Sequence, residues 1–97
     1  MKNINFGLYI RSVREEKKIP QRIVAQQLNI DTSTLSKIEL GERHLSISMV
    51  QPLCQILELD FKQFQVKFIS EQILEVYQKQ PFLKEALALA NSQLESK

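Results

Sequence analysis

The sequence predicts an all-α fold, and three observations support this prediction. Apolar side chains recur at helical spacing along most of the 97 residues, and capping residues stand where the periodic segments begin or end. The chain has only 2 Gly and 3 Pro, whereas folds rich in β-turns need more such residues. A chain of this length forms one compact core, so we expect one domain with an appendage rather than two full domains.

The first two predicted helices are short and are separated by Pro20. The first is expected over residues 5–17, where four apolar side chains share one face: Phe6, Tyr9, Ile10 and Val13. Pro20 suits the start of a second helix over residues 21–28, and the buried stripe of that helix is Ile23, Val24, Ala25 and Leu28. Asn29 then allows a tight exit, because asparagine tolerates the left-handed conformation.

A third helix is expected over residues 32–40, directly after this turn. Asp31 can cap its first turn, and Gly41 can end it. Two short helices joined by a turn of about three residues form a helix-turn-helix signature. Apart from Leu35 and Ile38, the third helix consists mainly of small or hydrogen-bonding residues with mediocre helix propensity. This composition indicates a surface that reads a partner.

A fourth helix follows a loop over residues 42–45. Either Ser46 or Ser48 can cap it, and the later start is preferred because it leaves Pro52 close to the first turn. A cap at Ser46 would put Pro52 deeper and kink the helix, so a bent first turn is the accepted alternative. The residues expected to face inward are Met49, Val50, Leu53, Ile56 and Leu57.

The C-terminal part predicts a helical hairpin. Asp60 caps a fifth helix that continues to about Gln80, and Pro81 opens a final helix. We divide the chain into a helix-turn-helix domain, residues 1–66, and a C-terminal helical extension, residues 67–97. The extension has more apolar surface than a hairpin buries, so we expect it to form a homodimer interface; the alternative is that it folds back over its own domain. The apolar residues of the extension that we expect to contribute to this interface are Phe68, Ile69, Ile73, Val76, Tyr77, Phe82, Leu83, Leu87, Leu89 and Leu94.

Composition and charge narrow the class of protein. The hydrophobic fraction of 43% is ordinary for a globular chain, and no stretch approaches about 18 consecutive apolar residues. The first five residues lack the apolar run of a signal peptide, so we expect a cytoplasmic protein without a membrane partner. Residues 1–48 have a net charge of +3 and residues 49–97 of −1. Any nucleic-acid surface is therefore expected in the first half, although ordinary scatter of surface charge also explains this difference.

The sequence argues against an enzyme. It has one His, one Cys and no clustered carboxylates, so we expect no catalytic residues, metal site or cofactor. The apolar neighbours of Cys54 favour a small core residue over a nucleophile.

The segment from Gln21 to Arg43 resembles the XRE family, the lambda-repressor/Cro-like helix-turn-helix DNA-binding proteins. The glutamine at the start of the second helix, the small Ala25, the Leu-x-x-Ile-Glu pattern and the glycine after it are all in register. The resemblance covers roughly residues 6–65, and it implies a five-helix lambda-repressor-like domain. Pro20 replaces a capping Thr or Ser of many members, and Asn29 replaces the usual turn glycine.

The resemblance also implies roles for individual residues. The positions that match the DNA base-contacting residues of the family are Thr32, Ser33, Ser36 and Lys37. Those that match phosphate-contacting residues are Gln21, Arg43 and, as an assistant, His44, for which a plain exposed loop residue is the alternative. Arg14 and Glu39 match a family ion pair that joins the first helix to the third. For Thr34, capping of the first turn explains the residue equally well.

These implications predict a sequence-specific DNA-binding transcriptional regulator. Its third helix would enter the major groove of double-stranded DNA, and a homodimer would read a short, roughly palindromic operator. The subtypes left open are a phage-type repressor, a restriction-modification controller and an antitoxin. A protein-interaction module that binds no DNA is the alternative from another class. The sequence indicates neither the operator nor a small-molecule effector.

Overall fold

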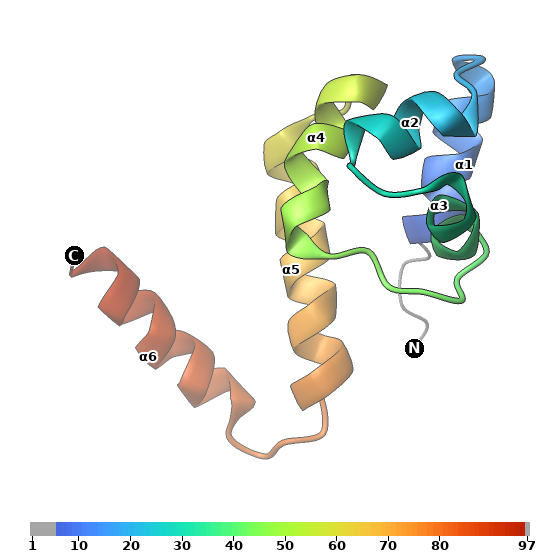
Figure 1. Ribbon diagram of the computed structural model, residues 1–97. Helices are drawn as coiled ribbons and strands as arrows, with labels where there is room; N and C mark the ends of the chain where they lie inside the picture. The colour runs from blue at the N-terminus through green and yellow to red at the C-terminus, as the bar shows by residue number, and fades with distance from the viewer. Residues whose placement is uncertain (1–5, 97) are drawn as a thin grey trace.

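The computed structural model describes residues 6–96, and over these residues it contains six α-helices and no strand (Figure 1). The helices are α1 (Phe6–Glu16), α2 (Gln21–Gln27), α3 (Thr32–Glu39), α4 (Ile47–Leu57), α5 (Phe61–Tyr77) and α6 (Leu83–Glu95). The all-α prediction is confirmed. The predicted start of the first helix, Asn5, lies outside the described residues.

Helices α1 to α5 surround one hydrophobic core. The buried apolar side chains come from all five helices and from the α3–α4 loop: Ile10, Val24, Ala25, Leu28, Leu35, Ile38, Leu45, Val50, Leu53, Cys54, Leu57, Phe64 and Phe68. An aromatic cluster joins α1 to α5, because the Phe6 ring lies 5.3 Å from that of Phe64 and 5.5 Å from that of Phe68. Tyr9 was expected on the buried face of α1, but it is 46% exposed and only borders this cluster.

Four helices end in the same way, with a left-handed residue that turns the chain back. These residues are Lys18 after α1 (φ 59°), Asn29 after α2 (φ 59°), Gly41 after α3 (φ 82°) and Glu58 after α4 (φ 57°). At the α2 exit, the amide of Ile30 donates to the Ala25 carbonyl at 3.0 Å, which satisfies a carbonyl at the end of the helix. The left-handed exit predicted at Asn29 is confirmed, and it sets the short α2–α3 turn.

Two of the predicted N-caps are confirmed and a third is corrected. Asp31 and Asp60 each accept a hydrogen bond from the backbone amide three residues later. The preferred start of α4 at Ser48 is wrong, because Ser46 is the N-cap residue and Pro52 lies inside the helix. Proline removes only the bond to the Ser48 carbonyl, and Ser48 is exposed to water. Burial of the apolar face of α4 offsets this loss.

The end of α5 and the start of α6 also differ from the prediction. Helix α5 ends at Tyr77 rather than near Gln80, and it runs unbroken across the predicted division after residue 66. Pro81 does not open α6; it lies in a turn before the N-cap residue, Phe82. Pro81 disfavours a helical conformation of Gln80, the residue before it. Helix α5 therefore ends before Gln80, and α6 begins only after the proline.

Helix α6 projects away from the body formed by α1 to α5 (Figure 1). None of its residues is buried. The radius of gyration is 15.4 Å, whereas a compact chain of this length has about 12.5 Å. In this structure α6 therefore does not fold back over the domain. Phe68 was expected at the dimer interface, but it is buried in the domain core because α5 continues past residue 66 and packs against α1.

Cys54 has the environment of a core residue. It is 2% exposed, and burial, together with the nearby charge of Asp60, raises the pKa of its thiol. A raised pKa keeps the thiol protonated and unreactive, as expected for a small core residue. Among residues 6–96, no helix is both long and apolar enough to cross a membrane.

The contact between α1 and α3 depends on Gly7. A Cβ atom at this position would collide with the Ile38 carbonyl oxygen and would also press on that of Glu39. Gly7→Ala should lower the free energy of unfolding by about 1 to 3 kcal/mol, because the added methyl group forces the two helices apart. Urea denaturation measures this loss.

The matched control is Ser12→Ala, which removes an exposed hydroxyl group from the same helix. It should change stability by less than about 0.5 kcal/mol. If both variants were as stable as the parent protein, α1 and α3 would not be in close contact.

Candidate nucleic-acid interface

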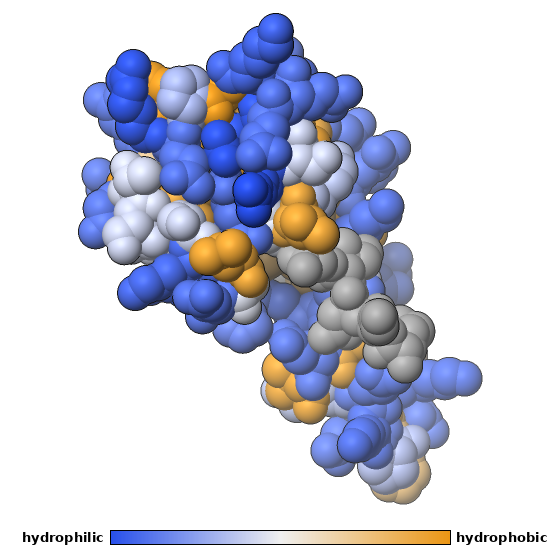
Figure 2. Space-filling model, turned by 90° about the vertical axis from the view of Figure 1, so that its right-hand side faces the viewer, coloured by the Kyte–Doolittle hydropathy of each residue, from blue (hydrophilic) through white to orange (hydrophobic). Residues whose placement is uncertain are grey.

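Helix α3 separates an apolar face from a polar face. Leu35, Ile38 and Glu39 are buried, whereas Thr32, Ser33 and Lys37 are exposed and Ser36 is half-buried. The four predicted base-contacting residues therefore lie on the side of α3 that faces away from the core. Figure 2 shows a face of the molecule on which hydrophilic side chains predominate and hydrophobic patches are small and separate.

The first turn of α3 is held by Asp31. Its carboxylate accepts a hydrogen bond of 2.7 Å from the Thr34 amide. Hydrogen bonds from the Thr34 side chain and backbone lower the pKa of Asp31, and the positive charges of Arg43 and Lys37 lower it further. The cap is therefore present above the usual pKa of the carboxyl group and is lost as the pH falls through the lowered value. Thr34 therefore takes part in the cap of the first turn, which was one of the two roles that the sequence allowed for it.

A buried ion pair fixes the other end of α3 to α1. The Arg14 guanidinium donates from Nε to Glu39 Oε2 at 2.7 Å and from Nη2 to Glu39 Oε1 at 3.0 Å. The two side chains are 11% and 3% exposed. The remaining end of the guanidinium donates to the Ile19 carbonyl at 3.0 Å. This bidentate geometry satisfies both charges away from water.

Gln21 extends this network to α2. Its Nε2 donates to Glu39 Oε1 at 3.0 Å, so the carboxylate accepts bonds from residues of two other helices. Within residues 6–96, the second N–H of the Gln21 amide has no hydrogen-bond partner. Gln21 borders a polar depression of about 160 Å³ between α1, α2 and α3, where Ser36 also lies. An anion in this depression could accept from that N–H.

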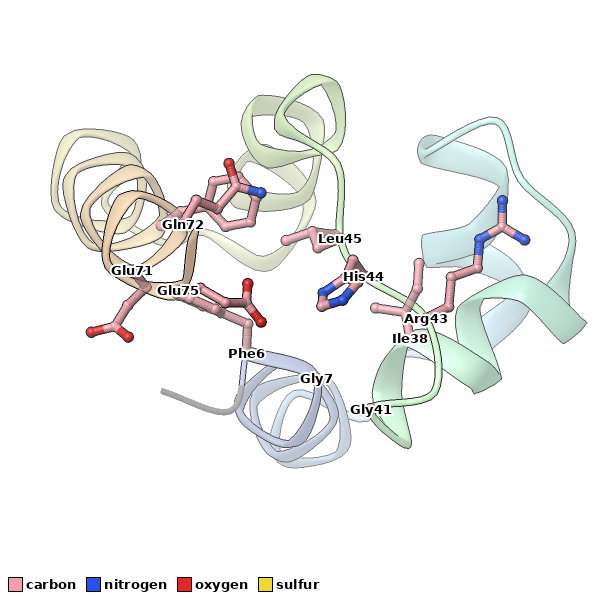
Figure 3. A pocket seen from close by; sticks show the side chains of 11 residues that line it. Phe6, Gly7, Ile38, Gly41, Arg43, His44, Leu45, Glu71, Gln72 and Glu75 are labelled. Carbon is pink, nitrogen blue, oxygen red and sulfur yellow. The ribbon is translucent and has the colours of Figure 1, made fainter. Parts of the chain in front are cut away.

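The two basic residues of the α3–α4 loop point in different directions. Figure 3 shows the Arg43 guanidinium directed away from a cavity of about 300 Å³, whereas the His44 ring lies toward its interior. The charge of Arg43 acts on Asp31, which places it near the start of α3. Arg43 is therefore close to the predicted base-contacting residues, and His44 instead faces the side of α5 that carries Glu75.

The structure brings most of the predicted residues into one region but adds features that the sequence did not indicate. The bond between Gln21 and Glu39 was not predicted, and neither was the place of Arg11 on the wall of the polar depression. Arg11 also pairs with Glu15 at 3.2 Å, with both side chains about half exposed. Helical spacing alone does not distinguish such an arginine from an ordinary surface residue. In the part of the chain that the structure describes, no group of His, Cys, Asp or Glu could hold a metal ion.

Comparisons with known proteins agree with this architecture. A family profile described as "Helix-turn-helix" matches residues 10–64. A solved structure, that of the clp gene regulator ClgR from Corynebacterium glutamicum, is similar with a TM-score of 0.58 and 21% sequence identity, over 89% of each chain. A search of curated protein sequences found no match. The structural likeness shows that the two chains share a fold.

The ion pair predicts a large effect of a single substitution on stability. Arg14→Ala leaves Glu39 buried without its charged partner, and breaking such pairs costs about 3 to 5 kcal/mol. Chemical denaturation should show a correspondingly lower free energy of unfolding.

Arg11→Ala is the control, because it removes an exposed ion pair from the same helix and should cost less than about 1 kcal/mol. An unfolding midpoint of Arg14→Ala equal to that of the parent protein would contradict the burial of this pair.

Proposed function

Because the chain belongs to the XRE family of helix-turn-helix DNA-binding regulators, we propose that it is a sequence-specific transcriptional regulator that reads a short, roughly palindromic operator as a homodimer. Helix α3 is the recognition helix and lies in the major groove. A regulator that acts on DNA also fits the cytoplasmic location expected from the sequence.

The observation that carries this proposal is the rigid polar face of α3. The exposed face of α3, with its small hydroxyl groups and one lysine, contributes little to folding, yet Asp31 holds the first turn of the helix and Glu39 anchors its last. Hydroxyl and ammonium groups are the donors and acceptors that read base edges in the major groove. We assign the base contacts to Thr32, Ser33, Ser36 and Lys37.

The phosphate contacts are assigned to residues on either side of α3. The second N–H of Gln21 would donate to a phosphate oxygen at the start of α2, where the helix dipole favours an anion. Arg43 would contact a phosphate beyond the other edge of the recognition helix. His44 is the weakest of the three contacts, since its ring faces the cavity beside α5 and would have to rotate outward.

The need for specificity supports a dimer, and a comparison supports a role in transcription. One recognition helix reads only a few base pairs, which is poor discrimination in a genome that offers about 10⁶ or more competing sites. A two-fold dimer places two such helices about 34 Å apart on a palindromic site. The similar structure of ClgR is described as that of a gene regulator, which agrees with a role in transcription.

The assignments of Lys37 and Arg43 predict effects of different kinds. Lys37→Ala should reduce discrimination between operator and random DNA by about 1 to 3 kcal/mol, because it removes a base contact. Arg43→Ala should weaken binding to both DNAs and lower the slope of log affinity against log salt by about 0.9 per lost phosphate contact. Fluorescence titrations at several salt concentrations, with DNA from upstream of the protein's own gene, measure both quantities.

Lys62→Ala serves as the control, because it removes one exposed positive charge from α5 rather than from α3. It should change neither discrimination nor the salt slope appreciably. Equal weakening of operator and random DNA by Lys37→Ala would refute its assignment as a base contact. If the parent protein bound no DNA at all, the protein-interaction module would be the better description.

A further inference from the structure

Helix α6 presents an apolar seam that the described chain leaves uncovered. Leu83, Leu87, Ala90 and Leu94 are spaced by four, three and four residues, which places them in one line along the helix. Leu94 is 70% exposed and Leu87 is 42% exposed. Such spacing is typical of a helix that packs lengthwise against another helix.

The seam opens into a groove between α5 and α6. This groove has a volume of about 530 Å³, and three of the four seam residues line it together with Ile73 and Tyr77 of α5. Figure 1 shows that α5 and α6 diverge from their connecting turn, so the groove has the shape of a V. An apolar helix is the kind of occupant that such a groove can bury.

The seam of α6 is complementary to a second, antiparallel copy of itself. If a two-fold axis passes between Leu89 and Ala90, the two Ala90 residues meet near the axis, where their small side chains let the helices approach. Leu94 of the partner subunit then lies between Leu83 and Leu87, and the symmetric contact repeats at the other end. Each seam leucine thus fills a space between residues of the other helix, as knobs into holes require.

The charges of α6 select the same arrangement. Lys84 and Glu95 lie at equal distances on either side of this axis and on the same flank of the seam. In an antiparallel pair, each Lys84 approaches Glu95 of the partner subunit, which gives two attractive contacts. In a parallel pair, Lys84 and Glu95 of the partner subunit would lie eleven residues apart along the helices, so neither attractive contact would form.

We propose that two copies of this protein associate by exchanging α6, so that each α6 packs antiparallel against the other inside the V formed by α5 and α6. The two-fold axis passes between Leu89 and Ala90. This inference rests on the dimeric regulator proposed above and specifies the surface that makes it dimeric. Mutual insertion also explains why α6 lacks buried residues in a single chain.

The first test compares Leu87→Glu with Leu89→Glu in the full chain. Both leucines are exposed in the single chain, at 42% and 61%, so neither change should unfold it, and circular dichroism checks this. Leu87 belongs to the seam and Leu89 lies on the opposite side of α6. Leu87→Glu should raise the dimer dissociation constant by about 100-fold or more, because each dimer contains two copies of the change, whereas Leu89→Glu should leave it nearly unchanged.

The second test determines the direction of packing. Lys84→Cys and Glu95→Cys are prepared separately and mixed under mild oxidation. The antiparallel arrangement predicts a disulfide between the two variants only when they are mixed. A parallel arrangement predicts no such disulfide, because positions 84 and 95 of its two chains lie eleven residues apart along the helices. The unsubstituted protein is the control for Cys54, which is buried.

Sedimentation and DNA titration together separate the possible failures. A folded Leu87→Glu protein that is monomeric and binds operator at least about 10-fold more weakly, while still contacting DNA, supports the proposal. A parent protein that is monomeric at micromolar concentration, or a Leu87→Glu protein that still dimerises, overturns the α6 seam. A parent protein that is dimeric but binds no DNA would instead overturn the proposed function and leave the α6 seam intact.

Discussion

The carboxylate of Glu39 is the point on which the recognition helix depends. It lies in the last turn of α3, where the helix dipole disfavours a negative charge, and it is 4% exposed. A carboxylate in such a place is tolerated only with strong partners, and Arg14 and Gln21 provide three hydrogen bonds to it. These partners belong to α1 and α2, so one buried charge determines how three helices meet.

This arrangement separates the stability of the domain from the chemistry of its surface. The close approach at Gly7 and the ion pair at Glu39 hold α3 from its inner side and its C-terminal end. Asp31 holds the first turn of the helix. The outer face of α3 therefore needs no packing role, and its residues are available for contacts with a partner. Gln21 belongs to both parts, because one N–H of its amide anchors Glu39 and its side chain also lines the depression proposed to hold a phosphate.

Local chemistry predicted those features of the fold that depend on neighbouring residues. The caps at Asp31 and Asp60 and the left-handed exit at Asn29 follow from side chains that act within a few residues. The predicted start of α4 was wrong because burial of the apolar face of this helix outweighed the local penalty of Pro52. The predicted start of α6 was wrong because Pro81 restricts the backbone of Gln80 and lies before the N-cap residue, Phe82.

Features that depend on distant parts of the chain were less accessible to sequence reasoning. The family resemblance supplied the pairing of Arg14 with Glu39, which periodicity alone could not, since 25 residues separate them. No signal in the sequence indicated that Gln21 also binds Glu39, or that Gly7 allows two helices to approach closely. The apolar excess of the C-terminal segment was visible, but the direction in which α6 projects, and so the groove beside it, required the structure.

We propose that the buried network around Glu39 orients the polar face of α3 toward DNA. The most direct measurement is an NMR titration of the labelled protein with a duplex from upstream of its own gene, long enough to carry two half-sites. The largest shifts should occur at the backbone amides of Thr32, Ser33, Ser36 and Lys37 and at the side-chain amide of Gln21. Shifts confined to other surfaces, with α3 and Gln21 unchanged while DNA is bound, would contradict it.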